Sequence, residues 1–198
     1  MNDTLHFISQ MARRWRTTGA IAPSGPALAR AMVKMVGNVQ PGEVLLELGP
    51  GTGVFTREIA RQFPANRLVA IEFNDVFASR LSAAMPQVEV VQGCASDIDT
   101  HLRDRGIPPE SIAAIISGLP LLSLPGDLPA RVLAAIHKAL PVGKRYVQFT
   151  YSERAWRKFR MPGFDRLPSR RIWMNFPPAV VMPFTRANEP AKMISPEM

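Results

Sequence analysis

The stretch Glu47-Leu48-Gly49-Pro50-Gly51-Thr52-Gly53 has the composition of a turn that binds a ligand, and it lies between an apolar run and a helical pattern. Glycines there let the chain bend tightly and approach a ligand, because no Cβ stands in the way. The helix that follows begins with unpaired N–H groups, which favour an anion. Glu72 closes the next apolar run, where an acid that binds a ribose is expected. Together these residues predict a nucleotide-type site, with an ordinary glycine turn as the alternative.

Short apolar runs alternate with helical patterns on both sides of this turn. The runs predict strands at 44–48, 68–73, 88–91, 112–116, 145–150, 172–176 and 180–184. Apolar residues at helical spacing indicate helices over 55–63, 76–85 and 128–140. Alternating strands and helices form a largely parallel sheet, whereas the last two runs are too close for a crossover helix. We therefore expect an α/β fold whose seven-stranded, mostly parallel sheet ends in a C-terminal antiparallel hairpin.

The glycine stretch resembles the first motif of S-adenosylmethionine-dependent methyltransferases, in which an acid such as Glu47 precedes the glycines. The resemblance implies a Rossmann-like class I methyltransferase fold. It also implies S-adenosyl-L-methionine as the cofactor, S-adenosyl-L-homocysteine as the product and cofactor contacts from the ends of successive strands. The implied contact residues are Glu47, Gly49, Gly51, Thr52, Gly53, Glu72, Phe73, Gly93, Cys94, Ala95, Ser117 and Gly118.

The sequence departs from that family after the third predicted strand. The family has a Gly-Asp-Ala step there, whose carboxylate contacts the adenine amino group, and this chain has Gly93-Cys94-Ala95. The side chain of Ser96 or Asp97, or the backbone of Ala95, is the candidate to replace that contact. We interpret Cys94 as a small buried residue and not as a redox centre.

The end of the fourth predicted strand bears on the substrate. The ribosomal RNA adenine dimethylases are similar through the glycine stretch and carry Asn-Leu-Pro-Tyr at this place, whereas this chain has Gly118-Leu119-Pro120-Leu121. The amide and the stacking ring are both absent, which argues against a flipped adenine as the substrate. Nucleic acid is therefore a disfavoured partner, and an rRNA adenine-type N-methyltransferase is the alternative function.

Further stretches resemble the bacterial phospholipid N-methyltransferases, which convert phosphatidylethanolamine to phosphatidylcholine. They are 19–24, which ends in Ser24, then 117–120 with its continuation 123–125, then 148–151 and 175–179. The resemblance implies N-methylation of phosphatidylethanolamine and of its mono- and dimethyl derivatives at a membrane surface. No obligate protein partner is evident, and the expected location is the cytoplasm, peripherally associated with the inner membrane.

Tyr151 and Ser117 are the candidate catalytic residues, because they follow the fifth and fourth predicted strands near the expected acceptor. The Tyr151 hydroxyl would accept the amine proton or orient the amine, and its ring would stabilise a methylammonium charge. A tyrosine that caps the core is the alternative for Tyr151.

Two segments are candidates for contact with an anionic bilayer. An amphipathic helix is predicted over 3–16, with Arg13, Arg14 and Arg16 on its polar face and Trp15 on its apolar half. This pattern is typical of an interfacial helix, and a helix that packs on the core is the alternative. A basic and aromatic zone after the fifth predicted strand begins with Arg154 and Arg157. We interpret the zone as a lid facing lipid head groups, with a single-stranded nucleic acid surface and a solvated loop as alternatives.

The composition sets outer limits. The 198 residues carry a net charge of +8, which favours an anionic partner, and the single cysteine excludes an intrachain disulfide. No Cys/His cluster has zinc-ligand spacing, and no apolar run is long enough to span a membrane. We divide the chain into N-terminal membrane-contacting helices (1–36), a cofactor-binding methyltransferase domain (37–186) and a tail (187–198).

Overall fold

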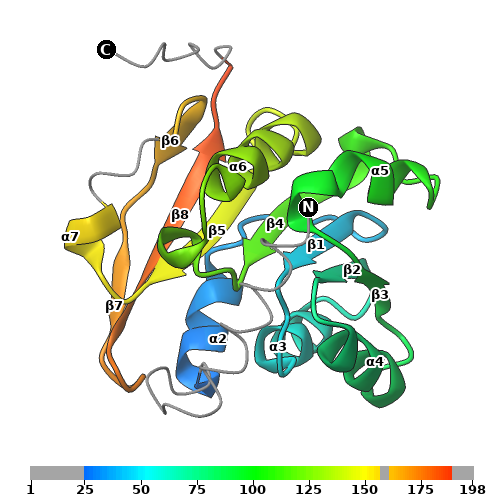
Figure 1. Ribbon diagram of the computed structural model, residues 1–198, viewed down its shortest axis with the longest axis horizontal. Coiled ribbons are helices and arrows are strands. Elements are labelled where there is room, and N and C mark those ends of the chain that lie inside the picture. Colours follow the sequence, from blue (N-terminus) through cyan, green and yellow to red (C-terminus); the bar gives the residue numbers. More distant parts are fainter. Residues whose placement is uncertain (1–24, 157–160, 189–198) are drawn as a thin grey trace.

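The computed structural model describes residues 25–156 and 161–188 (Figure 1). Its helices are α2 (Pro26–Lys34), α3 (Val54–Gln62), α4 (Asp75–Ala84), α5 (Ile98–Arg103), α6 (Leu128–Ala139) and α7 (Glu153–Trp156). Short 3-10 turns are η1 (Ala95–Asp97), η2 (Pro109–Ser111) and η3 (Leu121–Ser123). Its strands are β1 (Val44–Leu48), β2 (Arg67–Glu72), β3 (Glu89–Gln92), β4 (Ile112–Ser117), β5 (Arg145–Thr150), β6 (Phe164–Arg166), β7 (Arg170–Ile172) and β8 (Ala179–Arg186).

The strands of the described ranges form one sheet in the order β3-β2-β1-β4-β5-β8-β6, and β7 also pairs with β8. Strands β1 to β5 run parallel, so their C-terminal ends meet at one edge of the sheet. Strand β8 is antiparallel to β5, β6 and β7. The strand order reverses between β1 and β4, and open α/β sheets bind ligands at the carboxyl ends of strands beside such a reversal.

Hydrophobic cores cover both faces of the sheet. Helices α5 and α6 pack on one face, and α2, α3 and α4 pack on the other (Figure 1). Successive residues of a strand point to opposite faces, so Leu46 and Leu48 of β1 enter the first core and Leu45 enters the second. Because both faces are covered, the central strands are apolar almost throughout, which is typical of a parallel sheet.

The helix starts near the carboxyl edge are fixed by local chemistry. Gly53 has a left-handed φ of 77° and is the N-cap of α3, so the turn after β1 leads directly into that helix. The side chain of Asn74 caps α4 by accepting a hydrogen bond of 3.0 Å from the Phe77 N–H. Pro26 at the first position of α2 removes a donor that would have no partner within the helix.

The expected α/β sheet and its antiparallel C-terminal hairpin are confirmed, with two corrections. Residues 25–156 and 161–188 contain eight strands instead of seven, because 164–166 pairs with β8 as β6. The strand predicted at 172–176 is β7 and ends at Ile172. Beyond it the Asn175 side chain bonds to the backbone of Gly25 and Pro177, so 173–178 forms the hairpin loop.

Helix α2 belongs to the core of the sheet. Its residues Leu28 and Met32 are fully buried among those of α3 and β8, so the C-terminal part of the predicted 1–36 segment packs on the sheet. The amphipathic helix predicted over 3–16 lies outside the described residues. None of the helices in the described ranges has the length and apolar content needed to cross a membrane.

Candidate cofactor and acceptor site

The glycine turn and Glu72 are joined at the carboxyl edge of the sheet. The Gly51 N–H donates a hydrogen bond of 2.9 Å to Oε2 of Glu72, and the Asn74 N–H donates one of 2.8 Å to Oε1. Burial raises the pKa of Glu72, while these backbone donors hold it down. Each oxygen retains a lone pair for a further donor, such as a ribose hydroxyl, so this predicted cofactor contact is preformed.

Glu47 lies beneath the same turn on the face covered by α3. Its side chain is fully buried, and neither carboxylate oxygen makes a well-formed hydrogen bond within the described residues. Burial raises the pKa of Glu47 from 4.5 to about 8, Thr56 lowers it and the Glu72 charge raises it further. A buried carboxylate without well-formed hydrogen bonds is costly, and a bound cation would stabilise it. S-adenosylmethionine carries a sulfonium and an ammonium, so Glu47 fits this cofactor.

The turn after β1 packs directly against the loop after β4. A Cβ on Gly118 would lie 2.6 Å from the carbonyl oxygen of Gly49, and a Cβ on Gly49 would lie 2.6 Å from a Leu119 methyl group. Gly49 also has a left-handed φ of 68°, which favours glycine. The contact at Gly118 is with the backbone of Gly49. No side chain therefore fits at position 118 unless the glycine turn 49–53, which we call the cofactor turn, moves.

Gln148 connects the loop after β4 to the last parallel strand, β5. Its Nε2 donates hydrogen bonds of 2.9 Å to the carbonyl oxygens of Leu119 and Phe149, and its Oε1 accepts one of 2.7 Å from the Tyr146 hydroxyl. Gln148 and Tyr146 are both buried. Low dielectric strengthens such a network, so the Leu119 carbonyl is held in one orientation.

The structure brings both candidate catalytic residues to this edge. Ser117 ends β4 and is buried, and its Oγ accepts a hydrogen bond of 3.2 Å from the Leu119 N–H. Tyr151 follows β5 and is partly buried, with its ring centroid 5.4 Å from that of Phe149 in an edge-on arrangement. Ser117 thus supports residues 117–120, which we call the acceptor loop. The catalytic roles of Ser117 and Tyr151 remain predictions.

Helix α5 covers Gly93-Cys94-Ala95, where the sequence differs from the Gly-Asp-Ala step of the methyltransferases. His101 Nε2 lies 3.1 Å from the Cys94 carbonyl oxygen, and a Cβ on Gly93 would meet the His101 ring at 2.4 Å. The Ser96 hydroxyl lies 3.1 Å from Cys94 Sγ, donates to Asp97 Oδ1 and accepts from Arg131. The polar candidates for the adenine contact therefore belong to one small network beside the cofactor edge.

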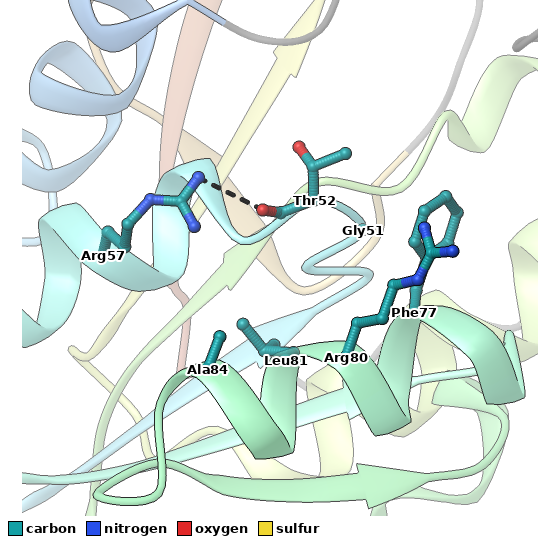
Figure 2. A pocket seen from close by; sticks show the side chains of 7 residues that line it. All are labelled: Gly51, Thr52, Arg57, Phe77, Arg80, Leu81 and Ala84. Atoms are coloured by element: carbon teal, nitrogen blue, oxygen red, sulfur yellow. Dashed lines mark hydrogen bonds between the residues drawn. The ribbon is translucent and has the colours of Figure 1, made fainter.

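A pocket adjoins the outer side of the glycine turn, between α3 and α4. Figure 2 shows its lining, which consists of Gly51, Thr52, Arg57, Phe77, Arg80, Leu81 and Ala84. Arg57 donates a hydrogen bond of 3.2 Å to the Thr52 carbonyl oxygen, so its guanidinium helps to fix the turn (Figure 2). No group of three or more metal-ligating side chains occurs among the residues that the structure describes.

The remaining predicted contacts lie in different parts of the structure. Arg154 is exposed on α7, and Phe73 directly follows Glu72 at the end of β2. Several candidate membrane or substrate residues lie outside the described ranges. These are Arg13, Arg14, Trp15, Arg16, Ser24 and Arg157.

Sequence reasoning missed what Gln148, His101 and Asn175 do. Gln148 and Asn175 stood in stretches that resembled a family, but no role followed from that. A glutamine inside a strand of a two-sided sheet must find a buried partner, and this was the signal that could have pointed to the Leu119 carbonyl. His101 sits in an ordinary helical segment and gave no such signal.

Comparisons with known proteins find similarity to two groups of methyltransferases. The profile of the ribosomal RNA adenine dimethylase family matches residues 28–105. The ribosomal RNA small subunit methyltransferase A of Geobacter sulfurreducens is 32% identical over 127 residues, which cover 62% of this chain and 42% of that protein. The ornithine lipid N-methyltransferase of Singulisphaera acidiphila is 30% identical over 183 residues, which cover 90% of this chain and 94% of that protein.

A solved structure of geranyl diphosphate methyltransferase in complex with S-adenosylmethionine superposes with a TM-score of 0.58 at 14% identity. The match covers 82% of this chain and 85% of that one, and it concerns the fold. The sheet order and the site define a class I methyltransferase that uses S-adenosylmethionine and acts on nitrogen. Within that class, the chain belongs to the same family as the ornithine lipid N-methyltransferase.

Proposed function

We propose that this N-methyltransferase methylates the primary amine of a membrane lipid head group. Phosphatidylethanolamine and its mono- and dimethyl derivatives are the proposed substrates, with phosphatidylcholine as the end product. The observation that carries the proposal is the similarity to a lipid N-methyltransferase over nearly the whole chain. The ribosomal RNA family profile, by contrast, ends at residue 105, before β4 and the acceptor loop begin.

The packing at Gly118 supports the choice of lipid over adenine. The ribosomal RNA adenine dimethylases resembled in sequence carry asparagine at this position, where a Cβ would lie 2.6 Å from the Gly49 backbone. An asparagine side chain therefore has no room here. The loop 117–120 therefore has neither the amide nor the aromatic ring that would hold a flipped base. A flexible aliphatic amine needs neither of these groups.

Methyl transfer requires the protein chiefly to position the amine and to exclude water. When bound, S-adenosylmethionine supplies a methyl group already activated on a sulfonium. The protein must align the amine lone pair with that methyl group and take up the proton that leaves nitrogen. We assign the alignment of the amine to the loop 117–120. Gln148 holds the Leu119 carbonyl of this loop in place. Tyr151 is the proposed residue that orients the amine or receives its proton.

The relative in Singulisphaera acidiphila makes ornithine lipid the second candidate substrate. Both lipids present a primary amine on a flexible arm, so the acceptor loop alone does not separate them. The proposed location follows from the substrate, because an enzyme that acts on head groups works at the bilayer surface. We propose a peripheral association with the cytoplasmic face of the inner membrane.

The test supplies purified protein with S-adenosylmethionine labelled on its methyl group and one acceptor at a time. The acceptors are vesicles with phosphatidylethanolamine, vesicles with ornithine lipid, and total RNA. We expect mono-, di- and trimethylated phosphatidylethanolamine and no label in RNA. Label in ornithine lipid alone would change the substrate within the proposed class, whereas label in RNA alone would overturn the proposal. Gly118→Asn, which is expected to be inactive on all three acceptors, is the control for contaminating activity.

A further inference from the structure

The hairpin loop 173–178 between β7 and β8 presents large apolar side chains to solvent. Trp173 is 74% exposed, Met174 is 86% exposed and Phe176 is 85% exposed. Among the described residues these are the most exposed large hydrophobic side chains. Single exposed apolar residues are common on protein surfaces, but three within four positions form a patch that calls for a partner.

The register of the sheet places this loop at the edge that carries the site. Ile172 of β7 pairs with Ala179 of β8, so the loop begins and ends at that pair. Thr150, the last residue of β5, pairs with Val180, the next residue of β8. The loop therefore extends beyond the carboxyl end of β5, where Tyr151 also lies. In Figure 1 this hairpin, drawn in orange, projects beside α2.

A side chain buried within the loop holds it in shape. Asn175 is buried between its exposed neighbours. Its Oδ1 accepts a hydrogen bond of 2.9 Å from the Gly25 N–H, and its Nδ2 donates one of 2.8 Å to the Pro177 carbonyl oxygen. The loop is thus tied to the start of α2, and the exposure of Trp173, Met174 and Phe176 belongs to a fixed conformation.

Positive charge flanks the patch on the strand that leads into it. Arg170 and Arg171 are exposed on β7, and the Arg171 guanidinium lies 5.4 Å from the Trp173 ring centroid. Arg171 also pairs with Glu153 at 3.2 Å, which fixes its position beside the ring. Aromatic rings next to arginines are typical of protein segments at the boundary between lipid head groups and acyl chains.

We propose that the loop 173–178 is a membrane-docking wedge, which inserts Trp173, Met174 and Phe176 into the interface of an anionic bilayer. Arg170 and Arg171 then contact lipid phosphates at the level of the head groups. This inference rests on the proposed lipid substrate, since it explains how the site edge meets the bilayer. The carboxyl ends of β4 and β5 then face the head groups, so a lipid amine reaches the acceptor loop without leaving the membrane.

The experiment uses the full chain and vesicles of equal parts phosphatidylglycerol and phosphatidylcholine. Neither lipid has a primary amine, so docking is measured apart from catalysis. The variant W173S/M174S/F176S should partition to these vesicles at least about tenfold more weakly than the wild type, since each buried apolar side chain is worth about one order of magnitude. Val142→Ser is the matched control, because Val142 is 50% exposed but precedes β5 at the opposite edge of the sheet. Its partition should stay within about twofold of the wild type.

Brominated acyl chains in the same vesicles test insertion directly. They should quench the part of the tryptophan fluorescence that Trp173→Phe removes. Equal vesicle binding by the triple variant and the wild type, or an unquenched Trp173, overturns the wedge. If phosphatidylethanolamine is nevertheless methylated, only this inference fails. If the wild type ignores vesicles and methylates RNA, the proposed function fails with it.

Discussion

Gln148 on β5 holds the carbonyl oxygen of Leu119 by a hydrogen bond of 2.9 Å, and it thereby ties the acceptor loop to the last parallel strand. The Tyr146 hydroxyl holds Gln148 in turn from two residues earlier on the same strand. Two of the stretches that resembled phospholipid N-methyltransferases in sequence, 117–120 and 148–151, are therefore in contact with each other. Their contact lies at the carboxyl edge, between the cofactor turn and the proposed position of the amine.

Gln148→Leu should slow methyl transfer without weakening cofactor binding. The substitution leaves the Leu119 carbonyl and the Tyr146 hydroxyl without this partner inside the protein, which costs about 1–3 kcal/mol of stability. The acceptor loop then loses its fixed orientation, and we expect kcat to fall by roughly tenfold or more. Measurements of kcat at saturating lipid and of the S-adenosylmethionine Kd by calorimetry separate the two effects.

Two further variants control this prediction. Gln62→Leu makes the same change on the exposed end of α3 and should leave kcat unchanged. Tyr146→Phe removes the bond to Gln148 but keeps the bond from Gln148 to Leu119, so its kcat should be intermediate. A Gln148→Leu protein with normal kcat would show that the loop needs no such anchor.

Glu47 should make stability depend on pH. The folded protein raises the pKa of this carboxyl from 4.5 to about 8. The folded state therefore binds a proton that the unfolded chain has already released, so stability falls as the pH rises from about 4.5 to about 8. Glu47→Gln removes this contribution. Urea unfolding at about pH 5.5 and about pH 8.5 should show a steeper loss in the wild type than in the variant.

The same carboxyl should couple cofactor binding to pH. A cationic cofactor pairs with the carboxylate and not with the protonated acid, so the affinity for S-adenosylmethionine should rise towards about pH 8. In Glu47→Gln the affinity should be weak at every pH. Calorimetry across this range tests the prediction, and parallel affinity profiles in the wild type and the variant would contradict it.

Gly118→Ala should disturb the cofactor turn from the neighbouring loop. Its Cβ would lie 2.6 Å from the Gly49 carbonyl oxygen, and backbone cannot move aside as a flexible side chain can. We expect a stability loss of about 1–3 kcal/mol together with a weaker affinity for S-adenosylmethionine. Gly106→Ala has open space around its Cβ but a left-handed φ of 60°, so it should also lose stability. It serves as a control because its affinity for S-adenosylmethionine should stay normal. Normal cofactor affinity in Gly118→Ala would show that the two loops move independently.

The cofactor turn was predictable because its determinants are local. A glycine-rich stretch between a strand and a helix specifies its own backbone, and it places Gly51 within hydrogen-bond distance of Glu72. The parallel order of β1 to β5 followed from the same alternation of strands and helices. In these regions, local propensity and tertiary packing favour the same structure.

The C-terminal strands were less predictable because they depend on distant contacts. Residues 172–176 are apolar except for Asn175 and look like a strand in sequence. Asn175, however, bonds to Gly25, which is 150 positions away, and the strand ends at Ile172. Strand β6 is short and forms only because β8 offers it an edge. The contact between Gln148 and Leu119 likewise joins separate strands, so neither local pattern specifies it.

Asn175→Ala should release the hairpin loop from α2. It removes the acceptor for the Gly25 N–H and the donor for the Pro177 carbonyl, which costs about 1–3 kcal/mol. Thermal unfolding measures this cost. The exposed Asn38 provides a matched control, since Asn38→Ala should change stability by less than about 0.5 kcal/mol. Equal melting temperatures for the two variants would mean that the side-chain bonds of Asn175 do not stabilise the loop.

Binding to anionic vesicles should divide into a part that salt weakens and a part that it does not. The arginines Arg13, Arg14 and Arg16 of the predicted N-terminal helix would contribute about 1 kcal/mol each near an anionic surface. Raising the salt from about 0.1 M to about 1 M shortens the Debye length from about 10 Å to about 3 Å and should remove most of this part.

The apolar loop 173–178 should resist the same change, because burial of its side chains does not depend on charge. Replacing the three arginines with Glu should therefore weaken the salt dependence of the remaining binding, to which Arg170 and Arg171 still contribute, while cofactor affinity stays normal. Co-sedimentation at both salt concentrations decides the matter, and unchanged salt dependence in the triple variant would show that other basic residues attract the bilayer.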